Sequence, residues 1–341
     1  MNKRALRSDI LLLITAAIWG FGFVAQRSGM EHTGPFAFNG IRFILGSVFL
    51  LPFIFFRRKR SSSLSNFSVS NLLLPSFAAG SFLFIAVIFQ QLGIIFTTAG
   101  NAGFITGLYV VLTPLFGIFL KRKTGIATWI GCVFTLAGLY FISVAGRPSI
   151  NPGDILIIVS AFFWAAHVLL IDRLMQGKRE TSIDPVGLSC GQFAVCGVFS
   201  LLGAFIVEPL TVDIVNSIDP SLLNEGLFAW LPFTQLVCAL KAGTVLFPAQ
   251  ALIPILYGGL CSVGIAYTLQ VIAQRDAPPA HATIILCFEG CFAAIGGALL
   301  LGEKTGAWTF IGFIFMLAGM IATQWEVIAK GQGKKNDTPC N

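Results

Sequence analysis

The sequence predicts an all-α integral membrane protein, with ten transmembrane helices arranged as two inverted five-helix repeats. Three observations predict this fold: an apolar composition, ten apolar runs of spanning length, and segments of the first half that return in the second. Of the 341 residues, 56% are hydrophobic and only 11% are charged, whereas a soluble domain carries about 25% charged residues. We therefore expect lipid to surround most of the chain.

Ten apolar runs follow one another between turn residues or charges. They cover residues 9–29, 35–56, 70–93, 98–120, 126–146, 153–174, 185–207, 249–273, 279–301 and 307–328. Each is close to the length that a helix needs to cross the hydrocarbon core. Inside a bilayer each must be helical, because no water is present to satisfy the backbone polar groups.

Basic residues orient these spans. The formal net charge is +7, but the lysines and arginines occur in short clusters between the apolar runs, which is typical of membrane orientation and not of a nucleic-acid-binding face. With both termini in the cytoplasm, 17 of the 22 basic side chains lie in cytoplasmic segments. We therefore expect a multi-pass protein of the plasma (inner) membrane, and no nucleic-acid partner.

The N-terminal segment and the cysteines have a plain interpretation. The first apolar run continues too far for a cleaved signal peptide, and no A-x-A site follows it, so we expect a retained first span. The eight cysteines contain no CxxC pair, and the three histidines lie far apart. Metal sites need clustered ligands, so we expect no metal and no cofactor.

Two pairs of segments reveal an internal repeat. SDILLLITAAIWG at 8–20 matches GDILIIVSAFFWA at 153–165, and KTGIATWIGCVFTLAG at 123–138 matches KTGAWTFIGFIFMLAG at 304–319. The offset between the copies is 145 residues in the first pair and 181 in the second. Each copy holds an odd number of spans, so the two copies lie in opposite orientations, as in many secondary transporters.

The repeat defines the domains that we expect. The change in offset falls in a long segment with four acidic residues, which we interpret as an insertion outside the membrane. The predicted units are a first repeat over 1–146, a second repeat over 147–330 with an external insertion over about 208–248, and a cytoplasmic tail over 331–341.

Four motifs in this order resemble a known family. They are AAIWGFGFVA (16–25), NGIRFILG (39–46), VLTPLFGIFLKRKTG (111–125) and FEGCFAAIGGALLLGEKTG (288–306). The chain is similar to the EamA-type ten-helix branch of the drug/metabolite transporter superfamily, over nearly its whole length except 208–248. The resemblance implies export of amino acids, amphipathic metabolites or drugs. The chain has Glu289-Gly290 where such families often have Glu-Pro, which implies a looser flex point.

Several uncharged side chains are candidates for a substrate site. Trp19 and Gly22 lie on one semi-polar helix face in the first repeat. At the equivalent positions the second repeat has Trp164 and His167. Each tryptophan lies about ten residues into its span, which favours a cavity wall over an interfacial belt. The candidate substrate-binding residues are Trp19, Gln90, Trp164, His167, Tyr267 and Gln270. The glutamines and Tyr267 also suit packing between helices, and both interpretations stay open.

Two charged residues lie inside predicted spans. We expect Arg42, about two turns into its span, to snorkel to the outer interface, with binding of an anionic ligand group as the alternative. Glu289 shares a helix face with small residues, so we expect its carboxyl to point into the bundle. A carboxyl that is neutral or charged according to access suits proton coupling, and a purely packing role is the alternative.

The function that we expect is a secondary transporter, an exporter of small organic solutes, working by alternating access. A membrane-embedded lipid-modifying enzyme is a weaker alternative, because no cluster of His, Asp or Cys lies near an interface. A non-transporting membrane scaffold is a second alternative, and it would not need polar residues at mid-depth. No G-x-x-x-x-G-K-[ST] motif points to ATP hydrolysis, and a homo-oligomer is compatible with the sequence.

Overall fold

The computed structural model describes residues 3–60, 70–121, 124–143, 152–176, 183–217, 249–303 and 306–336. Over these residues the chain forms helices joined by short turns, and they contain no strand. The predicted all-α fold is confirmed. The cytoplasmic tail is described only as far as residue 336, and most of the predicted external insertion lies outside the described residues.

The helices of the two halves follow the predicted apolar runs closely. In the first half they are α1 (Lys3–Met30), α2 (Pro35–Arg60), α3 (Ser70–Ile94), α4 (Ala99–Thr106), α5 (Tyr109–Phe119) and α6 (Ile126–Ser143). In the second half they are α7 (Pro152–Met175), α8 (Pro185–Ser217), η4 (Ala249–Ala251), α11 (Leu252–Leu256), the π-helix η5 (Tyr257–Tyr267), α12 (Thr268–Ala273), α13 (Pro279–Leu286), α14 (Phe288–Leu301) and α15 (Ala307–Asn336).

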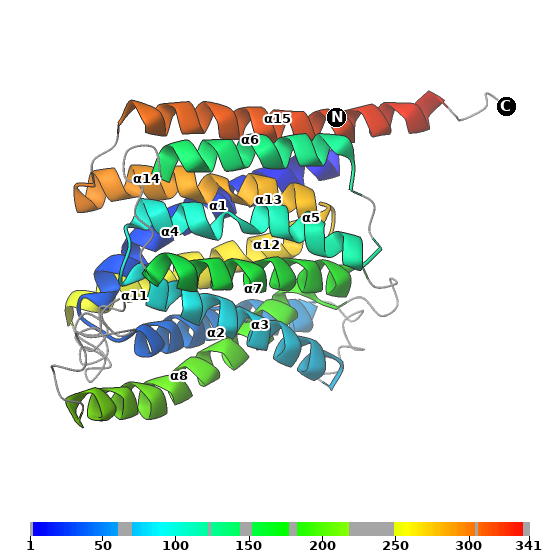
Figure 1. Cartoon of the computed structure of the whole chain (residues 1–341). Helices are drawn as coiled ribbons and strands as arrows, with labels where there is room; N and C mark the ends of the chain where they lie inside the picture. Colours follow the sequence, from blue (N-terminus) through cyan, green and yellow to red (C-terminus); the bar gives the residue numbers. More distant parts are fainter. Residues whose placement is uncertain are drawn as a thin grey trace.

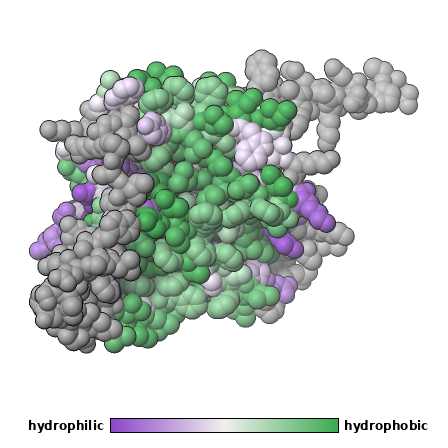
Figure 2. Space-filling model, in the orientation of Figure 1, coloured by the Kyte–Doolittle hydropathy of each residue, from purple (hydrophilic) through white to green (hydrophobic). Residues whose placement is uncertain are grey.

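Eight helical stretches are long and apolar enough to cross a membrane, and shorter apolar helices occupy Ile126–Phe141 in α6 and Phe310–Ala322 in α15. The helices run roughly along one common direction (Figure 1). Apolar side chains cover the middle of the visible surface, and polar side chains gather toward the helix ends (Figure 2). This band is what a bilayer requires, because hydrocarbon cannot solvate polar groups. The count of ten spans stays a prediction.

Helices that the sequence repeat relates to one another also pack together. The second helices of the two halves, α2 and α8, are in contact, and so are the last ones, α6 and α15 (Figure 1). Glycines make the second contact close: a Cβ on Gly138 would lie 2.6 Å from the Gly312 carbonyl, and one on Gly319 would lie 2.8 Å from the Gly131 carbonyl. Both glycines close an LAG motif, so the motif serves helix packing.

Two of the predicted spans are broken near their middle. The fourth span divides into α4 and α5 at Gly107, and the ninth divides into α13 and α14 at Cys287. The two breaks touch, since the Cys287 thiol donates a hydrogen bond to the Gly107 carbonyl at 3.4 Å. A Cβ on Gly103 would lie 3.1 Å from the Cα of Gly290. Gly290 therefore permits a close crossing, immediately after Glu289.

Polar contacts tie the helix ends together. Arg27 forms an ion pair with Glu303 at 3.3 Å, and His281 lies 2.9 Å from Asp9. The Glu208 carboxylate accepts hydrogen bonds from the first backbone amides of α2, 2.8 Å from the Phe36 nitrogen. Glu208 belongs to α8, which continues to Ser217. The first ten residues of the predicted external insertion are therefore helical.

Candidate functional site

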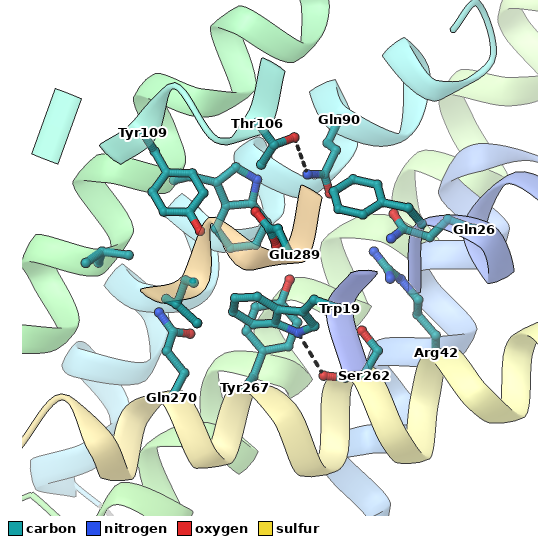
Figure 3. A pocket seen from close by; sticks show the side chains of 14 residues that line it. Trp19, Gln26, Arg42, Gln90, Thr106, Tyr109, Ser262, Tyr267, Gln270 and Glu289 are labelled. Carbon is teal, nitrogen blue, oxygen red and sulfur yellow. Dashed lines mark hydrogen bonds between the residues drawn. The ribbon is translucent and has the colours of Figure 1, made fainter. Parts of the chain in front are cut away.

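A cavity lies in the interior, between the two halves of the chain. Its walls come from both halves and include the helix break that carries Glu289 (Figure 3). It is lined by Trp19, Phe23, Gln26, Arg42, Gln90, Thr106, Tyr109, Trp164, Val168, Ser262, Tyr267, Gln270, Leu286 and Glu289. Five of the six candidate substrate-binding residues, and Glu289, meet in this lining. The exception is His167.

Three aromatic rings form one wall. The ring centroids of Trp19 and Tyr267 lie 4.5 Å apart, those of Trp164 and Tyr267 lie 5.8 Å apart, and those of the two tryptophans lie 6.1 Å apart. The equivalent positions of the repeat thus bring their tryptophans onto a single tyrosine. Tilted and offset ring contacts of this kind hold the side chains in place and present apolar faces to a ligand.

The π-helix η5 supplies a backbone acceptor next to this wall. The Trp19 indole nitrogen donates a hydrogen bond to the Ser262 carbonyl at 3.3 Å (Figure 3), and the Thr15 hydroxyl lies 3.2 Å from the Ala266 carbonyl. π-Helical segments are rare and frequently occur at functional sites. In α7, the Trp164 indole nitrogen is buried and has no hydrogen-bond partner among the described residues.

Glu289 lies in the first turn of α14, at the crossing of the two broken helices, and is 3% exposed. Its Oε1 atom and the Tyr109 hydroxyl are both buried, and neither has a hydrogen-bond partner of good geometry within the described part of the chain. Tyr109 lies beside the carboxyl. The expectation that Glu289 points into the bundle holds in this geometry. Its chemical role stays a prediction.

Amide side chains surround the same space. Gln90 donates a hydrogen bond to the Thr106 hydroxyl at 2.9 Å (Figure 3). Both polar atoms of the Gln270 amide and the Oε1 atom of Gln26 are buried without a partner among the residues described. Buried polar atoms are nearly always paired in proteins. A ligand or a bound water in the cavity would therefore supply hydrogen-bond partners for these unpaired polar atoms.

Arg42 corrects an expectation. It does not snorkel to the interface: the residue is 2% exposed and lines the cavity. Its Nε atom donates a hydrogen bond to Asn39 Oδ1 at 2.9 Å. The guanidinium carbon lies 5.5 Å from the Phe38 ring centroid and 5.0 Å from that of Phe43. These partners sit within one turn on the same helix and hold the charge inside the bundle.

His167 lies away from the cavity lining. It is fully buried, its Nε2 atom lies 2.9 Å from Gln192 Oε1, and its ring meets Trp164 edge-on at 5.9 Å. The structure therefore places it behind the tryptophan, where it joins α7 to α8. His167 was expected to share a cavity face with Trp164, but it does not line the cavity, and its hydrogen-bond partner is Gln192 on α8.

The sequence analysis missed Tyr109, Thr106 and Ser262 as lining residues. Tyr109 lies beside Glu289, two residues after the Gly107 break, and the sequence offered no signal for it because the break itself was not predicted. Thr106 and Ser262 have no sequence signal, because threonine and serine are common in membrane helices. The described residues contain no group of three or more His, Cys, Asp or Glu side chains placed to hold a metal ion.

Comparisons with known proteins agree with this architecture. The model of the EamA-like transporter family matches residues 6–144 and 225–324. The chain belongs to the EamA-like transporter family. It is a multi-pass membrane transporter, and family membership implies a small-molecule substrate. A solved crystal structure superposes with a TM-score of 0.62 over 97% of this chain and 99% of that one, at 15% identity, which shows the fold alone.

Its relatives carry transporter names. An "Uncharacterized transporter" of Archaeoglobus fulgidus is 27% identical, over 94% of this chain and 87% of that protein. The "Uncharacterized inner membrane transporter YedA" of Escherichia coli K12 is 24% identical, over 61% of this chain and 74% of its own length. A "Probable amino-acid metabolite efflux pump" of Salmonella typhimurium is 28% identical, over 52% of this chain and 57% of that protein.

Proposed function

We propose that this protein is a secondary transporter that exports small organic metabolites by alternating access between its two inverted halves. The observation that carries the proposal is a cavity built from both halves and lined by buried polar atoms without partners. A membrane scaffold would have no use for such atoms, because packing alone favours an apolar interior. A lipid-modifying enzyme that uses a metal would need clustered ligands, and the described residues contain no group of three or more His, Cys, Asp or Glu side chains placed to hold a metal ion.

Two broken helices support the alternating-access step. In secondary transporters, discontinuous helices meet near the bilayer midplane and form the substrate site. Here α4 with α5, and α13 with α14, break where they touch, and Glu289 follows one break. Short helix segments can reorient about a break more readily than a continuous helix. The crossing is thus the place where access to the cavity would change sides.

Glu289 is the proposed proton-coupling group. A buried carboxyl that forms no ion pair in the described residues is costly to leave charged in a membrane. It can take a proton when water reaches it from one side and release that proton to the other. Coupling this change to the two orientations of the cavity would drive export.

Reconstituted vesicles test the coupling. Flux of candidate amino acids and amphiphiles is measured with and without a pH gradient, for the wild type, Glu289→Gln and Glu289→Leu. The amide resembles a protonated acid in shape and hydrogen bonding, so Glu289→Gln should fold and exchange substrate but lose gradient-driven flux. If the residue only packs, Glu289→Gln should keep the gradient dependence and only Glu289→Leu should lower the yield.

The proposed orientation, with both termini in the cytoplasm of a plasma (inner) membrane, has its own test. A reporter fused after Lys335 should read cytoplasmic, and one inserted after Ser217 should read external. A cytoplasmic signal after Ser217 would contradict the span order on which the inverted repeat rests.

A further inference from the structure

Arg42 is a buried cation with few protein partners. Among the described residues no carboxylate lies within ion-pair distance of its guanidinium, and one hydrogen bond, from Nε to Asn39, is formed. The rings of Phe38 and Phe43 flank it. The guanidinium has five N–H donors and stays charged in proteins. Four of these donors have no partner among the described residues, in a side chain that lines the cavity.

The second half of the chain shows that the fold does not need this charge. At the repeat offset of 150 residues, Arg42 corresponds to Gln192, and at the offset of 145 residues Gly22 corresponds to His167. In the second half His167 and Gln192 bond to each other at 2.9 Å and fill the space between α7 and α8. In the first half a Cβ on Gly22 would meet nothing closer than Ser262 Oγ at 3.5 Å.

The first half therefore has a glycine and a cation where the second has a hydrogen-bonded side-chain pair. In the view of Figure 3, Arg42 and Gln26 lie at one end of the cavity, and Tyr109 and Gln270 lie at the other. The aromatic rings of Trp19 and Tyr267 lie between these ends. A ligand oriented along this lining would place an anionic head toward Arg42 and an apolar body along the rings.

We propose that Arg42 binds the carboxylate of the transported substrate, and that the substrate class is a carboxylic acid with an aromatic or bulky apolar body, such as an apolar amino acid. The two terminal nitrogens of Arg42 match the two oxygens of a carboxylate in a bidentate contact. One guanidinium balances one negative charge, which favours a carboxylate over a doubly charged phosphate. This inference rests on the proposed function, because it names the ligand of the same cavity.

A ligand series on the purified wild-type protein tests the assignment without any mutation. Binding is measured by calorimetry for phenylalanine, 3-phenylpropionate, phenylalaninamide and 2-phenylethylamine, which share the aromatic body. The two carboxylates should bind at least about tenfold more tightly than the amide and the amine, because charge-assisted hydrogen bonds are lost with the carboxylate. Equal affinities across the series, or no binding of either carboxylate at millimolar concentration, would overturn it.

Variants at Arg42 assign the effect to this residue. Arg42→Gln places at this position the side chain that α8 carries at the equivalent one, and should remove the preference for phenylalanine over phenylalaninamide. Arg42→Lys keeps the charge but loses the planar fork, so an intermediate preference is expected. If Arg42→Gln does not fold, Gly258→Leu serves instead: a Cβ on Gly258 would lie 3.3 Å from Arg42 Cδ, so the larger side chain should displace the guanidinium and weaken phenylalanine binding. An unchanged preference in Arg42→Gln, or unchanged binding in Gly258→Leu, contradicts the proposal.

The source of the anionic group is tested in the same way. The phosphonate analogue of phenylalanine and short-chain phosphatidylserine compete with bound phenylalanine in detergent. Competition by phosphatidylserine at lower concentration than phenylalanine itself would assign the cavity to a lipid headgroup and overturn the proposal. Gradient-driven flux of an uncharged amphiphile, with no preference for carboxylates, would leave the transport function intact and remove only the role of Arg42.

Discussion

The two halves of the chain share the segments of the sequence repeat but place different chemistry on them. Trp19 and Trp164 are equivalent and meet on one wall of the cavity. Gln90 and Gln270, 180 residues apart in the sequence, both line it. Both LAG glycines, at the ends of the halves, permit close packing of α6 against α15. These shared features hold the bundle together and shape the cavity.

The charged groups follow no such symmetry. The position equivalent to Glu289 at the offset of 181 residues is Leu108, and the position equivalent to Arg42 is Gln192. Each half therefore contributes one charge to the cavity, the first a cation and the second an acid. We expect that one cation and one acid at different positions of the repeat would favour a single orientation of a bound substrate.

The largest effect is expected when the first half is made to resemble the second. The double variant Gly22→His with Arg42→Gln should form the pair that His167 and Gln192 form in the second half. A Cβ at Gly22 would meet its nearest neighbour, Ser262 Oγ, at the ordinary contact distance of 3.5 Å, so we expect the variant to fold, but phenylalanine binding should fall by at least about tenfold. Calorimetry and size-exclusion profiles of the two proteins measure this. Wild-type affinity in the double variant would show that the asymmetry has no part in binding.

A second prediction concerns the helix that faces Glu289. A Cβ on Gly20 would lie 2.7 Å from the Glu289 carbonyl oxygen and 2.8 Å from the Ala293 nitrogen. A Cβ on Gly22 would lie 3.5 Å from its nearest neighbour, Ser262 Oγ. Backbone atoms cannot yield as side chains do, so Gly20→Ala should destabilise the protein by about 1–3 kcal/mol. Gly22→Ala is the matched control and should be neutral or slightly stabilising, since alanine favours a helix.

Thermal unfolding in detergent compares the two alanine variants under one set of conditions. A lower melting temperature for Gly20→Ala alone is the expected result. Equal melting temperatures would mean that α1 and α14 move apart readily, and that their close contact does not hold the cavity wall in place.

The fold was predictable where lipid imposes it. Apolar runs predicted many helix bounds within a few residues, for example 35–56 against Pro35–Arg60, because a spanning segment has no alternative to a helix. Two helices continue past their runs: α8 ends at Ser217 and not at 207, and α15 ends at Asn336 and not at 328. The helix breaks at Gly107 and Cys287 were not predicted, because the residues on both sides of each break are equally apolar. Tertiary contacts produce them, and a single sequence does not report such contacts.

The cavity was predictable in part for a related reason. The repeat identified Trp19 and Trp164 as cavity-lining residues, because a tryptophan far from both membrane interfaces in two equivalent helices is unusual. Arg42 was placed wrongly because snorkelling is the usual solution for an arginine in a span. The rings that flank it inside the bundle are those of Phe38, one turn earlier, and of Phe43, the next residue. His167 was drawn from the cavity by Gln192, a contact across helices.

A third prediction tests whether the second half uses its polar pair only for packing. Gln192→Leu leaves His167 buried without its partner, which should cost about 1–3 kcal/mol of stability. Substrate affinity should stay within about twofold, because His167 and Gln192 do not line the cavity. Unfolding curves and calorimetry on the same preparation measure both. A large loss of affinity would place this pair in the binding site and remove the contrast between the halves.

The smallest effect is expected at the Arg27–Glu303 ion pair, where α1 meets the end of α14. The two side chains are 38% and 20% exposed, so water screens their attraction, and such pairs contribute about 0–1 kcal/mol. Glu303 also accepts a hydrogen bond from the Ala99 amide at 3.2 Å, and Arg27 donates one to the Thr97 carbonyl at 3.0 Å. Both residues therefore bind the start of α4 as well as each other.

A double-mutant cycle separates these contributions. Arg27→Gln, Glu303→Gln and the double variant are unfolded thermally in detergent at low and high salt. Glu303→Gln should cost more than Arg27→Gln, because an amide oxygen accepts the Ala99 bond less strongly than a carboxylate does. The coupling energy should be below about 1 kcal/mol and should shrink in high salt. A coupling that is larger and independent of salt would show that this end of the bundle is shielded from water, and that opening the cavity there requires breaking the pair.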